Sequence, residues 1–420
     1  MRVVIVGGGF GGLAAARELR HVDAEVVLLD RNLHHTFLPL LYQVASGALN
    51  PGDVTYSLRA FAGHFDNVRF RRAEVTGVEA ADHHVDLDDG TRIAYDYLVL
   101  ATGVGPNYFG VPGAAEHSSH IYTRNASIEL RDRLLGGLEA LAQDGDHAGA
   151  SVVVVGGGAV GVEIAGALAG LRNAALPIAY PELSPAQLRI VLVELTDRLL
   201  APFAPSLRAY ALRQLRRRGV EVHLETSVAE VHPDHVVLDD GRQLSSVATI
   251  WATGVQAPDA VAQWGLPQAG GGRIRVGDDL RVVGESRVFA IGDIAAHDDD
   301  PLPQLAQPAM QGGRHAARQI RRLADGQASE PFTYRDKGIM ATIGRNAAVA
   351  QLPRGLRLRG PVAWLAWVVL HVAQLMGNRN RLATLANLSV RYLSWKRSAN
   401  VIVGDPGRRP RGQAGSTPNG

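Results

Sequence analysis

The stretch VVIVGGGFGG at residues 3–12 decides the fold. A β-branched apolar run leads directly into glycines, and a helix-forming segment follows at residues 13–20. This order predicts a buried parallel strand, a tight turn and a helix N-terminus, which together form a dinucleotide-binding unit. Gly7 permits the turn, Gly9 lets a pyrophosphate approach the backbone, and Gly12 allows the helix to pack closely on the strand. The free N–H groups and the positive dipole end of the helix then favour phosphate.

The same arrangement recurs as VVVVGGGAVG at residues 152–161, where Gly156, Gly158 and Gly161 repeat the three glycine roles. The duplication predicts an α/β protein with two Rossmann-like dinucleotide-binding domains, the second inserted into the first.

In both units the next apolar strand ends in an acid, Asp30 in the first and Glu194 in the second. A carboxylate at this position accepts hydrogen bonds from ribose hydroxyls and repels a 2′-phosphate, so it predicts NADH rather than NADPH. Glu194 follows its last glycine by 33 residues, against 18 for Asp30. We attribute the excess to a loop marked by Pro177, Pro181 and Pro185.

Composition narrows the class of protein. The chain has 420 residues, of which 46% are hydrophobic, so two or three folded domains are expected. It contains no cysteine, which excludes disulfides, thiolate metal sites, iron–sulfur clusters and thiol-based redox chemistry. His34 and His35 do not predict a metal site, because adjacent side chains diverge and no third ligand has suitable spacing.

Charge is distributed unevenly along the chain. Residues 337–400 contain ten Lys or Arg and no Asp or Glu, and residues 401–420 add a net +2. Because the whole chain carries +2, the first 336 residues carry −10. A basic end on an acidic body favours docking on an anionic membrane surface. Nucleic-acid binding is not expected, because the basic residues lack a binding motif.

Two C-terminal segments suit such docking. Residues 362–370 are apolar, with Trp364 and Trp367 on adjacent turns, but the run is too short to span a bilayer. A second segment repeats anchors at helical spacing, with Arg391, Lys396 and Arg397 nearby; the anchors are Leu382, Leu385, Leu388, Tyr392 and Trp395. We expect amphipathic helices lying in the headgroup layer. The alternative is that they pack on the body or on a second copy of the chain.

The N-terminus predicts no signal peptide, because the first core strand begins at Arg2. We therefore expect a peripheral protein on the cytoplasmic side of the cell membrane. Residues 405–420, which are rich in Gly, Pro and Arg, are expected to be a disordered tail.

The order of the later motifs points to a family. After Gly103 the first unit is interrupted, and it resumes at VFAIGD, residues 288–293. Two Ala-Thr-Gly turns, at residues 101–103 and 252–254, lie where the chain would cross between domains. This order resembles the two-dinucleotide-domain flavoprotein superfamily. The resemblance implies non-covalent FAD on the first unit, NADH as substrate on the second, and Asp293 bonded to the ribityl–phosphate part of FAD.

The lack of cysteine argues against the disulfide, thioredoxin and sulfide:quinone reductases of that superfamily, which need cysteines. Five motifs instead resemble the type II, non-proton-pumping NADH:quinone dehydrogenases, and they run in family order over most of the chain. They are RNLHHTFLPLLYQVA at 31–45, YFG at 108–110, WATGVQ at 251–256, AQPAMQ at 306–311 and DKGIMATIG at 336–344. Departures are Ala159, where the family often has Pro, and Thr36 and Leu38.

The resemblance implies a peripheral flavoenzyme of the respiratory chain that passes two electrons from NADH through FAD to a membrane quinone, ubiquinone or menaquinone, without pumping protons. It implies domain limits of 1–110 with 280–345 for FAD, 111–279 for NADH and 346–404 for membrane docking.

The expected catalytic residues are Glu163, Gln307 and Gln311. Gln307 and Gln311 are four apart, so they share one helix face, and amides there can hydrogen-bond quinone carbonyls. Pattern alone favours a simple polar helix face, and the resemblance reverses this in favour of a quinone site. We expect Glu163 in the first turn of the NADH-binding helix, where the dipole stabilises an acid. The resemblance places it beside the contact between nicotinamide and flavin.

The resemblance also places Pro39, Leu40 and Tyr42 near the flavin ring, and Lys337 on FAD or its supporting strand, where a simple turn lysine is the alternative. The cofactor-binding candidates are Gly7, Gly9, Phe10, Gly11, Gly12, Asp30, Arg31, Pro39, Leu40, Tyr42, Val75, Ala101, Thr102, Gly103, Gly156, Gly158, Ala159, Val160, Gly161, Glu194, Thr253, Gly254, Val255, Gly292, Asp293, Gln307 and Lys337.

Two other functions stay open at this point. One is a soluble NAD(P)H-dependent flavin reductase that serves a protein acceptor such as ferredoxin. The other is a non-catalytic, redox-sensing flavoprotein. A homodimer is also left open.

Overall fold

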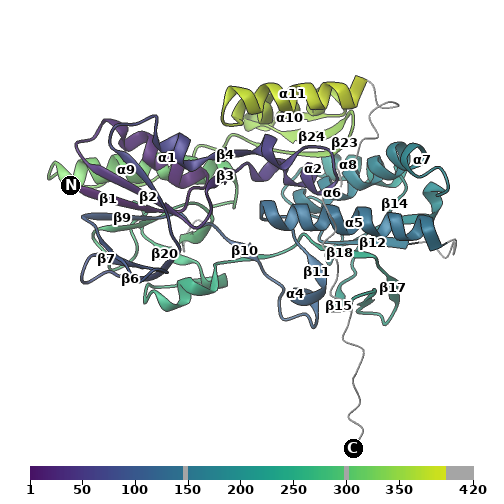
Figure 1. The fold of residues 1–420 in the computed structure, drawn as a ribbon, viewed down its shortest axis with the longest axis horizontal. Helices are drawn as coiled ribbons and strands as arrows, with labels where there is room; N and C mark the ends of the chain where they lie inside the picture. The colour runs from purple at the N-terminus through teal and green to yellow at the C-terminus, as the bar shows by residue number, and fades with distance from the viewer. Residues whose placement is uncertain (145–149, 298–301, 394–420) are drawn as a thin grey trace, which may run out of the picture.

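A computed structural model describes residues 1–144, 150–297 and 302–393 of the chain (Figure 1). The first lobe contains a five-stranded parallel sheet in the order β21-β9-β1-β2-β5. Its strands are β1 (Arg2–Val6), β2 (Glu25–Asp30), β5 (Val68–Arg72), β9 (Tyr97–Leu100) and β21 (Val288–Ala290). Helix α1 (Phe10–Glu18) follows the first glycine turn and packs along α9 (Ala306–Ala324). The glycine motif at residues 7–12 therefore lies at the carboxyl end of β1, the central strand of the sheet.

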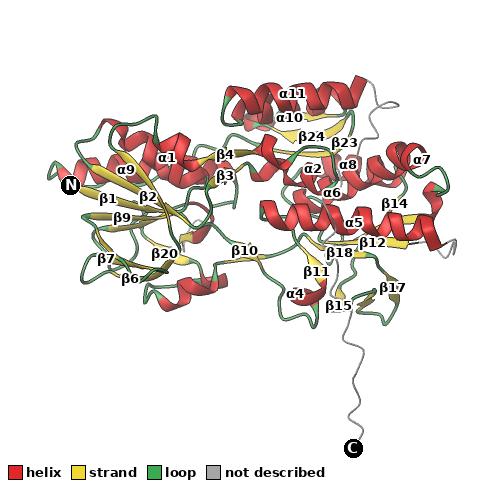
Figure 2. Cartoon of the chain, viewed as in Figure 1, coloured by secondary structure: helices red, strands yellow, loops and turns green. Residues whose placement is uncertain are grey.

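The second lobe repeats this plan, as the duplicated motif predicts. Its parallel sheet has the order β11-β18-β12-β13-β14. The strands are β11 (Ser118–Ser119), β12 (Ala150–Val155), β13 (Leu188–Val193), β14 (Val220–His223) and β18 (Ala248–Trp251). The helices are α5 (Arg124–Asp144), α6 (Ala159–Gly170) and α8 (Pro205–Arg217). The mixed architecture of parallel sheets and helices confirms the predicted α/β class (Figure 2).

Each lobe also carries a three-stranded antiparallel meander. The first is β6 (Val75–Glu79), β7 (His84–Leu87) and β8 (Arg92–Ala94), and the second is β15 (Val228–Val231), β16 (His235–Leu238) and β17 (Gln243–Ser245). Two of the segments that connect the lobes, β10 (Gly105–Pro106) and β19 (Val255–Gln256), pair antiparallel. Figure 1 shows this two-stranded connection at the centre of the molecule.

Smaller elements complete the two lobes. They are the pairs β3 (His34–Thr36) with β4 (Thr55–Ser57) and β20 (Ile274–Val276) with β22 (Ala295–His297), and the short helices α3 (Leu58–Ala62), α4 (Ala114–His117) and α7 (Leu176–Ala179). Helix α7 corrects the expected loop at Pro177. The chain continues helically from α6 through Leu171–Ala175, and Pro177 stands in the first turn of α7, where a proline is tolerated.

A central layer connects the lobes. The segment from Phe37 to Val54, which includes α2 (Leu41–Ala45), leaves the first sheet and joins the apolar core of the second lobe. The antiparallel sheet β23 (Ile339–Gly344), β24 (Ala347–Gln351) and β25 (Arg357–Arg359) packs on α6 and α8. Helices α10 (Pro361–Gln374) and α11 (Asn378–Leu393) lie over this sheet, at the top of Figure 1.

The span Ala159–Ala179 is long and apolar enough to cross a membrane, but 61% of its most apolar window is buried inside the protein. It contains α6, the helix that follows the second fingerprint. We therefore assign it as a core helix. Helix α10 is apolar but shorter.

Helix α6 touches β23 through its backbone at Gly166, where a Cβ would lie 2.4 Å from the carbonyl oxygen of Ile343. Gly166→Ala is therefore expected to lower the free energy of unfolding by about 1–3 kcal/mol, because the helix and strand must separate. Gly170→Ala is the matched control on the same helix, because its Cβ would meet no atom within 4 Å. It should keep or raise the stability by roughly 0.5–1 kcal/mol. Urea denaturation of both variants checks this, and equal effects would contradict it.

Candidate active site

The first glycine turn contains two crowded positions and one open one. A Cβ at Gly7 would lie 2.3 Å from the oxygen of Ala101, and one at Gly12 would lie 1.9 Å from the oxygen of Gly7. Beside Gly9 there is no atom within 4 Å, and α1 begins there without a side-chain cap. Uncapped N–H groups facing open space suit a phosphate group.

The second turn has the same geometry. Gly156 has φ +109° against +110° at Gly7, and a Cβ at Gly161 would lie 1.9 Å from the oxygen of Gly156. Gly158 faces open space, and α6 also begins without a side-chain cap. Both turns therefore have room for a pyrophosphate at the same relative position.

The two strand-end acids are held by the turns themselves. Asp30 Oδ2 accepts from Gly8 N at 2.7 Å, and its Oδ1 accepts from Asn32 N at 2.7 Å. Glu194 Oε2 accepts from Gly157 N at 2.6 Å, and its Oε1 accepts from Thr196 N at 2.8 Å. Each carboxylate is thus fixed beside its glycine turn, where a ribose would lie.

Further residues surround the first turn. Thr102 follows β9, and its Oγ1 is buried without a hydrogen-bond partner in the described residues, so a bound polar group would satisfy it. Gly292 has φ +71°, and the neighbouring Asp293 is half-buried. Burial raises the pKa of Asp293 to about 6, although nearby Arg273 opposes the shift.

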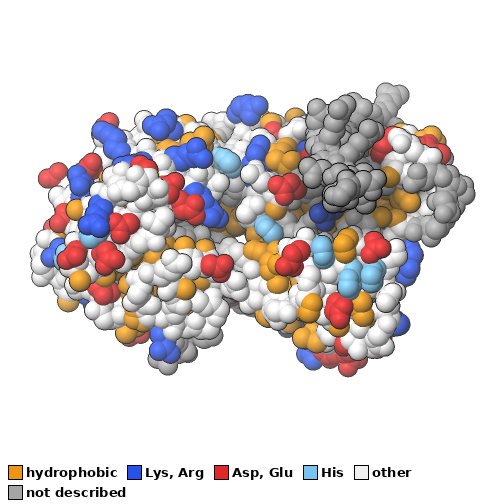
Figure 3. All heavy atoms as spheres, turned by 60° about the horizontal axis from the view of Figure 1, so that its bottom comes forward, with side chains coloured by type: hydrophobic (Ala, Val, Ile, Leu, Met, Phe, Trp, Pro, Cys, Tyr) orange, Lys and Arg blue, Asp and Glu red, His pale blue; other side chains and the backbone are white. Residues whose placement is uncertain are grey.

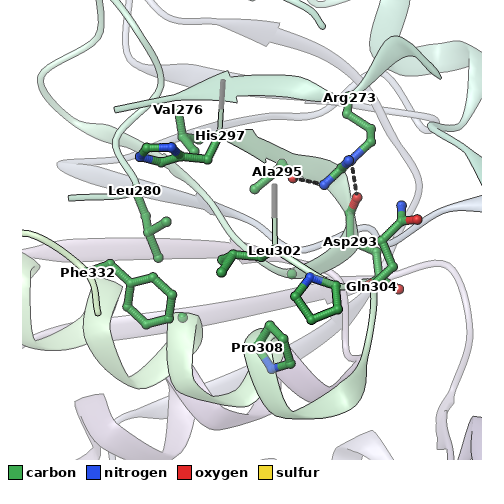
Figure 4. Close-up of a pocket in the computed structure, with 13 residues that line it drawn as sticks. Arg273, Val276, Leu280, Asp293, Ala295, His297, Leu302, Gln304, Pro308 and Phe332 are labelled. Atoms are coloured by element: carbon green, nitrogen blue, oxygen red, sulfur yellow. Dashed lines mark hydrogen bonds between the residues drawn. The ribbon is translucent and has the colours of Figure 1, made fainter. Parts of the chain in front are cut away.

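Arg273 shapes the pocket beside Asp293 (Figure 4). Its Nε donates to the backbone oxygen of Asp293 at 2.9 Å, and its Nη2 donates to the oxygen of Ala295. The pocket lies between β20 and β22 on one side and the start of α9, at Pro308, on the other.

The segment after β2 folds back onto the first turn. His35 Nδ1 lies 3.0 Å from the oxygen of Gly8, and burial lowers the pKa of His35 to about 4, so its ring is neutral at pH 7. Phe10 packs edge-on against His35 and Phe37. Pro39 and Leu40 follow in a single 3₁₀ turn, where Leu40 is fully buried.

The two glutamines lie on α9 as predicted, but they have different surroundings. Gln311 Nε2 donates to the oxygen of Arg335 and its Oε1 accepts from the nitrogen of Arg335, both at 3.0 Å. Its amide therefore ties down the segment before β23. Gln307 is half-buried in the first turn of α9, which has no side-chain cap. Gln307 is thus the amide better placed to bind a ligand.

The remaining candidates divide into interior and surface positions. Gly254 has φ +65°, and a Cβ there would meet the ring of Phe109 at 2.2 Å. Arg31 and Lys337 are exposed, and Arg31 pairs with Glu74 at 3.4 Å. The candidates that are buried or half-buried are Gly11, Val75, Ala101, Gly103, Ala159, Val160, Thr253 and Val255.

Glu163 is a buried acid on α6, at the contact between this helix and β23. It lies in the second turn of α6, so its expected place in the first turn is wrong, because the helix begins at Ala159. Its side chain faces β23, where Thr342 N donates to Oε1 at 3.1 Å, and the side chain of Trp367 also hydrogen-bonds to it. Burial raises the pKa of Glu163 to about 8, although both of these hydrogen bonds act to lower it. The acid is therefore mainly protonated at neutral pH.

Sequence reasoning missed the partners of Glu163. Trp367, expected as a membrane anchor, is only 1% exposed, because α10 turns this side of the helix inward. Thr342 Oγ1 lies 3.0 Å from the hydroxyl of Tyr42, which accepts from Gln43 Nε2 at 2.9 Å. The sequence did contain one indication that this side of the helix faces inward: His371, a polar residue, interrupts the apolar run one turn after Trp367.

Leu388 is also buried, so it is not a surface anchor. Two other predicted anchors, Leu382 and Leu385 on α11, are exposed. Trp395 and the tail expected at residues 405–420 lie outside the described residues.

Comparison with known proteins gives a consistent picture. The family described as pyridine nucleotide-disulphide oxidoreductase matches residues 1–313. The chain is 36% identical over 422 residues to the type II NADH:quinone oxidoreductase NdhA of Mycobacterium tuberculosis, covering 96% of this chain and 89% of the relative. It is 34% identical to Ndh of the same organism, covering 96% and 90%. The solved structure of NDH2 from Plasmodium falciparum in complex with NADH has a similar fold, with a TM-score of 0.86 at 20% identity, covering 94% and 99%.

The buried acid predicts a pH-dependent stability. Because the pKa of Glu163 is about 8 in the folded protein and near 4.5 when exposed, the folded state binds the proton more tightly. The free energy of unfolding should therefore fall as pH rises between these values, by up to about 1.4 kcal/mol per pH unit. Glu163→Gln should remove this part of the slope, and urea denaturation across that range measures it. The exposed Glu79→Gln is the control, and an unchanged slope in Glu163→Gln would contradict the prediction.

Proposed function

The chain belongs to the pyridine nucleotide-disulphide oxidoreductase family and to its type II NADH:quinone oxidoreductases, and from this premise we propose how its residues serve that reaction. The protein is an enzyme that oxidises NADH and reduces a quinone. The observation that carries the proposal is the pair of open, uncapped helix N-termini beside Gly9 and Gly158, in a chain without cysteine.

The first turn would hold FAD non-covalently. Uncapped N–H groups beside Gly9 suit its pyrophosphate, Asp30 suits the adenosine ribose, and Thr102 and Asp293 offer polar groups to the rest of the cofactor. FMN would leave Asp30 without a ribose. Bound FAD supplies the chemistry of accepting a hydride from NADH and releasing two electrons to the quinone. Residues 1–110 and 280–345 form the domain proposed to hold it.

The second turn, within residues 111–279, would hold NADH. Glu194 is fixed by Gly157 N and Thr196 N, so it cannot turn away from a ribose without losing both bonds. A 2′-phosphate would meet this fixed negative charge, which favours NADH over NADPH.

Gln307 is the proposed quinone ligand, because its amide can bind a carbonyl oxygen without the cost of burying a charge. Gln311 supports the site by holding the segment that leads to Lys337 and β23. Reduction of a quinone by NADH takes up one proton, and Glu163 carries a proton at neutral pH. We therefore assign Glu163 as the acid that serves this step.

The protein would reach its quinone by docking on a membrane. Helix α10 exposes Val362, Leu365 and Val369, which are 65%, 57% and 59% exposed, and α11 exposes Leu382 and Leu385. The surrounding residues 337–400 contain basic side chains and no acidic ones. On the first lobe, by contrast, charges of both signs are interspersed (Figure 3). We propose peripheral attachment at the cytoplasmic side of the cell membrane, through residues 346–404.

One spectroscopic experiment tests the proposed function. Purified protein incubated with FAD should show a flavin absorbance that NADH bleaches under anaerobic conditions and that a short-chain quinone restores. An oxidised ferredoxin added in place of quinone should not restore it, which separates this function from the soluble reductase. Folded protein that takes up no FAD, or flavin that quinone fails to reoxidise, would contradict the proposal.

The membrane proposal predicts the result of removing the exposed face of α10. The triple variant Val362→Ser, Leu365→Ser and Val369→Ser should bind vesicles containing anionic lipid about a thousandfold more weakly or worse, because each apolar side chain contributes about 1.5 kcal/mol or more when buried. Co-sedimentation measures the bound fraction. Val283→Ser, at an exposed apolar position of the first lobe, is the control and should bind like the wild type. Unchanged binding of the triple variant would contradict the proposed face.

A further inference from the structure

The carboxyl group of Glu163 is held by two donors that cannot accept a proton. One is the backbone N–H of Thr342, on β23, and the other is the indole of Trp367, on α10. An indole nitrogen donates only. All three residues are buried, with 8%, 3% and 1% exposure for Glu163, Thr342 and Trp367. The proton on the acid is therefore not taken by either partner.

The indole is itself fixed on two sides. The ring of His371, one turn along α10, stacks on Trp367 with centroids 4.0 Å apart and planes 20° apart. His371 is held in turn, because its Nδ1 lies 2.8 Å from the backbone oxygen of Trp367 and Phe37 packs edge-on against its ring. Tyr42 meets the indole edge-on at 6.1 Å. The direction of the indole N–H is thus set before any ligand binds.

The helix that carries Trp367 is seated closely on the sheet. Ala363 on α10 and Ala348 and Ala350 on β24 are all fully buried in one small cluster, so small side chains allow the helix to approach. The titratable groups that touch the two donors of Glu163 are Tyr42 from α2, on Thr342, and His371 from α10, on Trp367, while β23 contributes none. Burial lowers the pKa of His371 to about 4, so its ring is neutral near pH 7.

We propose that Trp367 is a positioning residue for the reaction: its indole N–H holds the carboxyl group of Glu163 in place and leaves the proton of the acid free for transfer. This inference rests on the proposed role of Glu163. The bond to the indole favours the ionised form of the acid and so offsets part of the effect of burial. Trp367 therefore brings the acid closer to releasing its proton at the pH where the enzyme works.

The test removes the N–H while keeping an aromatic ring. In Trp367→Phe, the pKa of Glu163 should rise, because a donor to the carboxylate is lost. Infrared titration of the holoenzyme follows the carbonyl band of the protonated acid, identified by its absence in Glu163→Gln. The midpoint should move to higher pH, and the alkaline limb of quinone reduction should move with it. Because the acid then releases its proton less readily, kcat at neutral pH should fall about fivefold, as expected for one hydrogen bond of about 1 kcal/mol. The KM for NADH should not change.

Trp364→Phe, on the same helix, is the matched control and should leave the midpoint in place. Because Trp367→Phe also changes ring size, replacement of Trp367 by β-(3-benzothienyl)alanine gives an isosteric ring without the N–H, and it should shift the midpoint in the same direction. An unchanged midpoint in both Trp367 replacements would overturn the proposal. Wild-type rates of quinone reduction in Glu163→Gln would instead overturn the role of the acid itself, so the two failures are distinguishable.

Discussion

Backbone contact between a strand end and a helix start is the constraint on which the rest of the structure depends. In both lobes the last glycine of the motif, Gly12 or Gly161, sits so close to the first that any side chain would overlap a carbonyl oxygen. This contact turns the helix N-terminus toward open space and leaves its N–H groups unpaired by protein. Asp30 and Glu194 end the neighbouring parallel strand in each lobe, and this position brings each carboxylate within hydrogen-bond distance of the glycine turn. The proposed phosphate and ribose sites thus depend on close packing that side chains at these glycines would prevent.

The sequence predicts those parts of the fold whose structure is determined by residues close together in the chain. The glycine turns, Asp30, Glu194 and the helix carrying Gln307 each depend on a short motif, and the structure places them as that motif requires. Glu163 is different, because its donor Thr342 is 179 residues away and Trp367 comes from a third segment. No local pattern reports such a contact. The same is true of Gln311, whose amide binds the backbone of Arg335 instead of facing a free surface.

The inward side of α10 shows how a helical pattern can mislead. Trp364 and Trp367 look alike in the sequence, since both interrupt an aliphatic run in a segment without acids. In the structure Trp367 is fully buried and bonds to Glu163, whereas Trp364 is only half-buried, and Val362, Leu365 and Val369 occupy the outer side. One short helix therefore has two different sides: its outer side exposes apolar side chains, and its inner side donates a hydrogen bond to a buried acid. A mean hydropathy over the segment cannot show which residues face inward and which face outward. That depends on how the helix is rotated about its own axis.

The paired crossings β10 and β19 have a consequence for how such a protein could arise. The chain leaves the first lobe at Gly105 and returns at Gln256, and these two residues are partners in the same antiparallel ribbon. Beyond the crossings, β9 and β21 lie side by side in register, although almost 190 residues separate them in the chain. The inserted lobe thus has adjacent ends, and the host sheet closes without it. A gene segment encoding that lobe could be gained or exchanged in a single event, while the strand order of its host stayed the same.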